Sequence, residues 1–369
     1  MDIFDPSELY NLSKEPVDRV HFDKIREWLH RNKDDNARLK EAFSYRGENG
    51  ETPLHVISHR DAPIDIIKTF ITYAPEAVKV TDSRGRLPLH NACWDTVSLN
   101  VVILLTESYP ESVKVTDSNG CLPLHNAVLS TASLEVSTFL IESYPMSVSV
   151  RDEMGRLPIH NACCRIEYWS DSLEVVSFLI ESYPEGMYET NTLITLTPFD
   201  MLKGFKWAET KDKNGMLPLH CVCKNGYSIP LIKVLLTAYP KATSVEDNDG
   251  NTPWKYLKET ASRKDENGML LLHRQAAHCK GLSVESLNIL FEAYSEAIRI
   301  QDNFGLLPLH HACLNEASSL GVLMSLLQLY PESIKARVAE NKVHNNSELG
   351  DLRAELALIK ANLEQIRQP

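Results

Sequence analysis

The sequence predicts an all-α solenoid, a stack of short helix pairs joined by hairpin turns. Eight stretches that begin with glycine match the pattern G-x-L/T-P-L-H-x-A fully or in part. Four of the gaps between successive glycines are 35 residues long. A fixed period in this range is typical of solenoids, in which each unit buries its apolar face only against its neighbours. The glycines are Gly50, Gly85, Gly120, Gly155, Gly215, Gly250, Gly268 and Gly305. We expect about seven full or near-full helix pairs and two truncated units.

Each unit opens with a turn and a short helix. In seven of the eight copies an aspartate stands three residues before the glycine, which is the arrangement of a turn with Asp at its first position and Gly at its fourth. The proline of the motif suits the first turn of a helix, where its missing N–H would have no partner. The best copies, PLHNAC, therefore predict a short first helix.

A second helix is expected to begin at a serine and to end at a Tyr-Pro pair. Six units place a serine 11 residues before the motif tyrosine, at Ser98, Ser133, Ser172, Ser228, Ser283 and Ser319. Serine is a favoured N-cap, and proline cannot continue the helical hydrogen bonds. An extended VKVTD-type stretch is then expected to lead to the next turn.

Turn, T-P-L-H helix, second helix and return strand together resemble the ankyrin repeat, from about residue 40 to residue 335. The period of 35 is slightly longer than the ankyrin period of about 33. The usual threonine stands at Thr52, Thr197 and Thr252 and is leucine in the other copies. The LPLHNAC and ESYPESVKVTDSNG variants resemble a sub-pattern of the repeat that is common in predicted proteins of diatom algae. The resemblance implies a protein that binds other proteins and has no chemistry of its own.

The repeat is irregular in three places. Gly155 and Gly215 are 60 residues apart, and Gly250 and Gly268 only 18. We interpret TLTPFDMLKG around Pro198 and TPWKYLKE around Pro253 as units that kept the first helix and lost the second, which predicts two gaps in the outer row of helices. In the fourth unit RIEYWSDS adds four residues between the helices, so that Tyr168 and Trp169 either contact a partner or fold onto their own unit.

The ends of the solenoid need caps, because an open apolar face would aggregate. We expect capping helices in residues 1–49, the repeat domain in 50–340 and an amphipathic heptad helix in 341–369. Leucine and isoleucine follow 3,4 spacing in that last segment. It packs back as a cap or forms a short coiled coil, so the chain is expected to be a monomer unless this helix self-associates.

Composition restricts the partners. The formal net charge is −12 and no block of five like charges occurs, which argues against nucleic acid. The N-terminus lacks the charge and apolar run of a signal peptide, and no run approaches 18 apolar residues. We therefore expect no membrane contact and a cytoplasmic location, with the nucleus as an alternative.

Candidate chemistry is weak. Seven motif histidines recur once per unit, where a ring can bond turn backbone in its own and the next unit, so a structural role is favoured over catalysis. Four cysteines three residues after a motif histidine are expected to be buried thiols: Cys93, Cys163, Cys223 and Cys313. No GxxxxGK, GxSxG or HExxH motif occurs, and we expect no catalytic residue, cofactor or metal.

The stacked turns and first helices are expected to form a concave binding face, with the serine-capped helices on the convex side. We expect a protein partner at residues on this face that have no role in forming the turn, together with the inserted aromatics. These residues are Arg84, Arg86, Trp94, Asn119, Met154, Arg156, Tyr168 and Trp169. A non-enzymatic scaffold is the first hypothesis, a regulatory subunit or inhibitor that occludes an enzyme is the second, and an enzyme with a site near Pro198 or Pro253 is the third.

Overall fold

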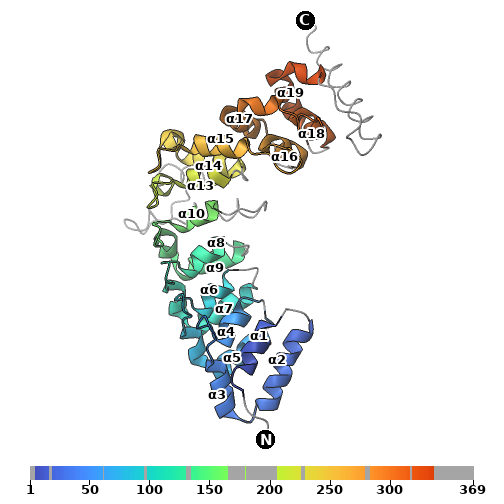
Figure 1. Cartoon of the computed structure of the whole chain (residues 1–369). Helices are drawn as coiled ribbons and strands as arrows, with labels where there is room; N and C mark the ends of the chain where they lie inside the picture. Colours follow the sequence, from blue (N-terminus) through green and yellow to red (C-terminus); the bar gives the residue numbers. More distant parts are fainter. Residues whose placement is uncertain are drawn as a thin grey trace. The chain divides into compact units, whose positions relative to one another are not determined.

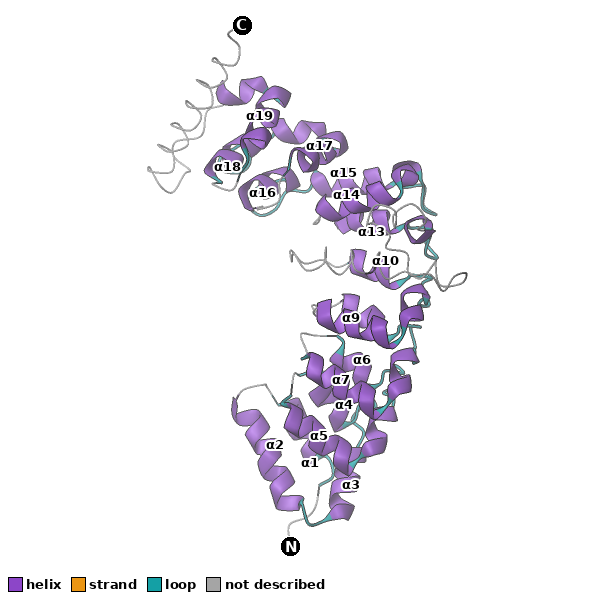
Figure 2. Cartoon of the chain, turned by 180° about the vertical axis from the view of Figure 1, so that it is seen from behind, coloured by secondary structure: helices purple, strands orange, loops and turns teal. Residues whose placement is uncertain are grey.

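The computed structural model describes residues 5–15, 19–60, 62–94, 98–129, 134–164, 206–225, 229–278, 283–315 and 318–335, together with Leu179. Within these ranges the chain forms α-helices and short 3-10 helices, and no β-strand (Figures 1 and 2). The chain divides into two compact units, one ending at Pro218 and one beginning at Leu219. The all-α expectation is therefore confirmed for the described part of the chain.

Two rows of helices make up the repeated part of the N-terminal unit (Figure 1). The first row contains α4 (Pro53–Ser58), α6 (Pro88–Ala92), α8 (Pro123–Leu129) and α10 (Pro158–Cys163), each in contact with the next. The second row contains α5 (Ile64–Tyr73), α7 (Leu99–Ser108) and α9 (Leu134–Ser143). The core lies between the rows, where Leu54, Ile67 and Leu105 are almost inaccessible. Full burial of such a side chain stabilises the fold by about 1.5–3 kcal/mol.

Three helices precede the first motif copy. They are α1 (Glu8–Lys14), α2 (Arg19–Asn32) and α3 (Asn36–Ser44). Helix α1 packs on α4 and α3 packs on α5, so these two extend the first and second rows. Helix α2 contacts both, and its Ile25 and Trp28 are fully buried. The apolar end of the N-terminal unit is thereby covered.

The turns have the conformation that the Asp-x-x-Gly pattern predicts. All eight motif glycines have φ between 71° and 80°, a left-handed conformation that side chains disfavour. In the second copy the amide of Gly85 donates to the carbonyl of Asp82 (3.0 Å), and the Asp82 amide donates to the carbonyl of Arg86 (2.9 Å). The aspartate carboxylate also accepts backbone amides of its own turn, at 2.9 Å from both Arg84 and Arg86.

The second helices begin at the predicted serines wherever those residues are described. Ser98, Ser283 and Ser319 each accept a backbone N–H of the first turn through their hydroxyl group. After the Tyr-Pro pairs, however, the expected extended stretch begins as a 3-10 helix, for example Pro110–Lys114. Proline at the first position favours this turn because its φ is already near the helical value.

The turn tips on either side of the 60-residue gap lie next to each other, whereas the predicted truncated unit around Pro198 lies outside the described residues. The amide of Lys213 donates to the carbonyl of Met154 (2.9 Å), just as Glu153 donates to Asn119 (2.8 Å) in consecutive copies. The turn at Gly215 therefore stacks directly on the turn at Gly155. The 3-10 helix Lys206–Glu209 leads into this turn and buries Trp207. The 25 surplus residues belong to a segment that includes 180–205, outside the described ranges.

The C-terminal unit contains helix pairs and one single helix. The pairs are α13 (Pro218–Asn225) with α14 (Ile229–Ala238), α16 (Leu271–His278) with α17 (Val284–Ala293), and α18 (Pro308–Leu314) with α19 (Leu320–Leu329). The single helix is α15 (Pro253–Ala261), followed directly by the turn at Gly268. A truncated unit at this place is confirmed.

The predicted gap in the outer row at α15 is wrong. Helix α17 contacts α14 as well as α15 and α19, so the second helices of the flanking pairs meet across the truncated unit. Closing the row in this way buries apolar surface that a gap would leave in water. The heptad segment 341–369, Ser133, Ser172 and Ser228 lie outside the described residues.

Candidate functional site

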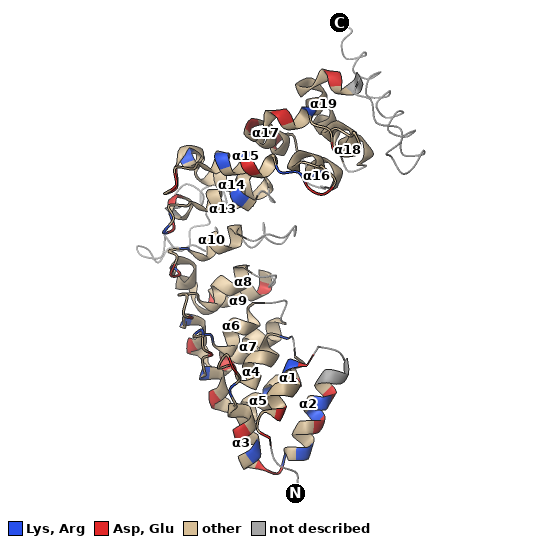
Figure 3. Ribbon diagram, viewed as in Figure 1, with Lys and Arg blue, Asp and Glu red and all other residues tan. Residues whose placement is uncertain are grey.

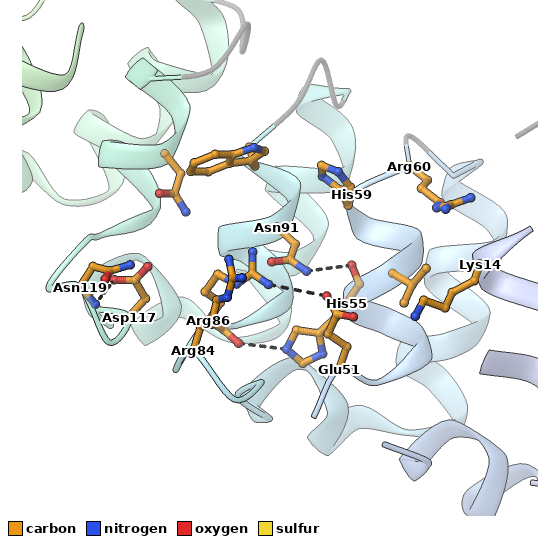
Figure 4. A pocket seen from close by; sticks show the side chains of 13 residues that line it. Lys14, Glu51, His55, His59, Arg60, Arg84, Arg86, Asn91, Asp117 and Asn119 are labelled. Atoms are coloured by element: carbon orange, nitrogen blue, oxygen red, sulfur yellow. Dashed lines mark hydrogen bonds and ion pairs between the residues drawn. The ribbon is translucent and has the colours of Figure 1, made fainter. Parts of the chain in front are cut away.

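A concavity of about 360 Å³ lies on the turn side of the N-terminal unit (Figure 4). Side chains from α1, α4, α6 and α8 and from the turns between them line it. We call this concavity the groove. Of the residues predicted for binding, it brings together Arg84, Arg86, Trp94 and Asn119.

The turn tips that form one edge of the groove are joined in a ladder of backbone hydrogen bonds. The amide of Ser83 donates to the carbonyl of Asn49 (2.9 Å), and that of Ser118 donates to Arg84 (2.8 Å). A Cβ atom added to Gly85 would lie 3.0 Å from the Ser118 nitrogen, so the tips approach this closely only because the residue is glycine. The ladder holds Arg84 and Asn119 at fixed positions on adjacent tips.

His55 and His90 connect their units to the next beneath the groove, whereas Nε2 of His125, His273 and His310 has no hydrogen-bond partner among the described residues. The Nδ1 atom of His90 accepts the Leu87 amide (3.1 Å), and its Nε2 donates to the Cys121 carbonyl of the following unit (3.1 Å). His55 bridges to the Arg86 carbonyl in the same way (3.0 Å), as Figure 4 shows. Burial lowers the pKa of His90 to about 4, so the ring is neutral near pH 7. The structural role expected for these histidines is confirmed.

Asparagines after the motif histidines form a second set of connections. The side-chain amide of Asn91 donates to the His55 carbonyl (3.2 Å), and that of Asn126 donates to the His90 carbonyl (3.3 Å). Both asparagines are buried and both line the groove. Trp94, just after α6, is 47% exposed beside them. The groove therefore combines a rigid polar floor with an exposed indole.

Arg86 and Arg156 differ from the expectation that they have no role in the turn. The guanidinium of Arg86 bonds the carboxylate of Asp82 (2.7 Å) and lies 3.6 Å from Glu51, and Arg156 bonds Asp152 (2.9 Å). The Asp82 and Asp152 side chains are fully or almost fully buried, so the arginines neutralise charges that would otherwise be costly. Although burial raises the pKa of Asp82, hydrogen bonds from Arg86 outweigh it and hold the pKa below its usual value.

The remaining predicted residues lie elsewhere. Met154 is 44% exposed on its turn tip, and neither it nor Arg156 is part of the groove lining. Tyr168 and Trp169 are outside the described residues.

The sequence patterns do not predict several of the residues that line the groove. They are Lys14, Glu51, His55, Val56, His59, Arg60, Asn91, Asp117 and Asn126. The recurrence of asparagine directly after the motif histidine, at Asn91, Asn126 and Asn161, is the signal that could have identified two of them. Lys14 and Arg60 carry no such signal, because only packing of α1 on α4 brings them to the groove.

The described cysteines form no disulfide with one another, and those of the predicted slots are buried as expected. Burial raises the pKa of Cys121 to about 12 and raises that of Cys93 further, so neither is a reactive thiolate near neutral pH. Within the described ranges no group of three or more His, Cys, Asp or Glu side chains is arranged to hold a metal ion.

Charges of both signs are interspersed over the described helices, as α2 illustrates in Figure 3. None of the described helices has the length and apolar character needed to cross a bilayer.

Neither a scan against models of known protein families nor a search of curated proteins finds a match to this chain.

Proposed function

We propose that the chain is an ankyrin-repeat protein that binds a partner protein in the groove and acts as a non-enzymatic scaffold or adaptor. Three features support the family: the 35-residue unit, the left-handed glycine at each turn tip, and the histidine that bridges successive units. In such a solenoid neighbouring units hold each other in place, and the stacked turns present an extended surface.

Trp94 is the observation that carries the proposed binding role. Its indole is 47% exposed at the groove, although a tryptophan of this fold can be fully buried, as Trp28 is. Tryptophan and arginine are enriched among the residues that dominate protein interfaces. An exposed indole next to Arg84, on a floor held by hydrogen bonds, is a surface that needs little rearrangement on binding.

The test is affinity capture from a native extract, with the captured proteins identified by mass spectrometry. Wild-type protein is compared with Trp94→Ala and with Leu320→Ala, which removes a 60% exposed apolar side chain from α19 in the other unit. We expect one set of proteins with the wild type and Leu320→Ala, and its loss with Trp94→Ala. Equal capture by all three would place the interaction away from the groove.

A further inference from the structure

Asp117 lacks a contact that other turn aspartates have. In four turns the second carboxylate oxygen is bonded by a side chain of the same unit, either the residue after the glycine or the sixth after it. These pairs are Asp82 with Arg86, Asp152 with Arg156, Asp247 with Tyr256, and Asp302 with His311.

The corresponding positions near Asp117 are Cys121 and Asn126, and neither provides a donor. The Asn126 amide is used on the His90 carbonyl. Oδ1 of Asp117 accepts the amides of Asn119 (2.8 Å) and Cys121 (2.9 Å), whereas Oδ2 accepts from no described side chain. Asp117 is 9% exposed and lines the groove.

Asn91 presents a second acceptor without a donor. Its Nδ2 is used on the His55 carbonyl, which leaves Oδ1 buried with no hydrogen-bond partner among the described residues. Asn91 is 5% exposed and also lines the groove. A buried acceptor left without a donor costs about 1–3 kcal/mol. Because Asn91 Oδ1 is inaccessible to solvent, only the Asp117 carboxylate presents an acceptor to a ligand without rearrangement of the groove.

We infer that the groove takes a cationic side chain, an arginine or lysine of a basic partner segment, with its charged group at Asp117 and its stem or face against Trp94. This inference rests on the proposed function and specifies the partner. A guanidinium has five N–H donors and no acceptor, and it is attracted to the face of an indole. The net charge of −12 also steers cationic segments toward the protein.

Most cations of the groove itself make contacts within the chain, although only Arg86 is paired with carboxylates of the described residues. Arg86 pairs with Asp82 and Glu51, Lys14 lies over the Tyr10 ring, and Arg60 donates to the Glu15 carbonyl. Arg84 is exposed and has no described side-chain partner. Arg84 therefore repels a cationic ligand and would attract an acidic one, so its removal distinguishes the two by the sign of the effect.

The experiment selects peptides from a random twelve-residue phage library on the full-length protein and measures their affinities by fluorescence anisotropy. Asp117→Asn retains Oδ1 for the turn and replaces Oδ2 by a donor. Asp212→Asn is the matched control, because Asp212 holds its turn in the same way (2.8 and 2.9 Å) but does not line the groove. Arg84→Ala and Trp94→Ala complete the set.

We expect selected peptides enriched in arginine and lysine. Asp117→Asn should weaken their binding by roughly tenfold or more, the effect of losing one charge-assisted hydrogen bond. Asp212→Asn should leave the affinity unchanged, Arg84→Ala should increase it and Trp94→Ala should reduce it.

Three outcomes would overturn the inference. The first is that no peptide is enriched, and the second is that the enriched peptides are acidic and bind Arg84→Ala more weakly than the wild type. The third is that the peptides are basic but bind Asp117→Asn as tightly as the wild type. If neutral or acidic peptides are selected and Trp94→Ala abolishes their binding, the cationic ligand is wrong while the groove remains a protein-binding site. If Trp94→Ala has no effect on any selected peptide, the proposed function fails as well.

Discussion

At the scale of the residue, the turn arginines divide into two kinds according to what their guanidinium groups contact. Arg86 and Arg156 bond buried aspartates of their own turns, whereas Arg84 is exposed without a described partner.

The change from threonine to leucine before the motif proline removes one local hydrogen bond. In the first copy Thr52 gives His55 two contacts, one through its hydroxyl (2.8 Å) and one through its amide (3.1 Å), and Leu87 retains only the amide contact.

Arg156→Gln should lower the free energy of unfolding by about 1–3 kcal/mol, because it leaves the Asp152 carboxylate buried without its charged partner. Chemical denaturation measures the effect. Arg84→Gln is the control and should change stability by less than about 0.5 kcal/mol. Equal effects of the two substitutions would show that the ion pair does not stabilise the turn.

At the scale of the element, close contact between successive turn tips is the feature that varies along the chain. A Cβ atom at Gly120 would lie 2.8 Å from the Glu153 nitrogen, but nothing lies within 4 Å of one at Gly250. The motif histidine is also replaced in the same truncated unit, by Lys255, whose ammonium group bonds Asn251. His220 still bridges the preceding unit to the Asn251 carbonyl (3.2 Å), but the tip contact and the histidine bridge from α15 to the following unit are missing.

Gly120→Ala should destabilise the protein more than Gly250→Ala. Both residues have nearly the same φ, 72° and 73°, so both variants carry the same left-handed strain of roughly 1–2 kcal/mol. Only Gly120→Ala adds a clash with backbone of the next unit. The difference in unfolding free energy between the two variants isolates the tip contact, and identical values would mean that the tips move apart at no cost.

Residues 250–267 should exchange backbone hydrogens faster than residues 85–155. The reason is the loss of the tip contact and of the histidine bridge, rather than a gap in the outer row, which α14 and α17 close. Opening free energy follows the contacts that are lost. Segment-resolved hydrogen exchange tests this, and equal protection would show that packing of the buried Leu257 and the Thr260 bond to the Lys224 carbonyl (3.0 Å) compensates.

At the scale of the whole molecule, the buried histidines couple stability to pH. Burial lowers the pKa of His90, His160, His273 and His310 to about 4 from an ordinary value of 6.5. These histidines therefore bind protons below pH 6.5 in the unfolded chain, whereas in the folded chain they bind protons only near pH 4. Their contribution to stability is complete above pH 6.5 and is lost as the pH falls through this window.

Between pH 7 and pH 5 the protein should lose about 2 kcal/mol of unfolding free energy for each of these histidines. Denaturant titrations at several pH values measure the loss. A stability that does not vary between pH 7 and pH 5 would show that the buried rings accept protons in the folded state.

The sequence by itself determined the repeated unit, because each part of it is local. A proline at the start of a helix, a serine cap, and a glycine three residues after an aspartate specify their conformations within a few neighbouring residues. For the same reason the histidine and cysteine slots were placed correctly, since a residue that recurs at one position of every unit has the same surroundings each time.

Tertiary structure alone decided how irregular units are accommodated and which side chains meet in the groove. The 60 residues between Gly155 and Gly215 do not reveal which turns lie next to each other, and only the backbone bond from Lys213 to Met154 shows that these two do. Likewise, whether an arginine is free or paired depends on whether the neighbouring carboxylate is buried, as at Asp152. Such contacts depend on packing between units, and packing acts over distances that no local pattern of residues encodes.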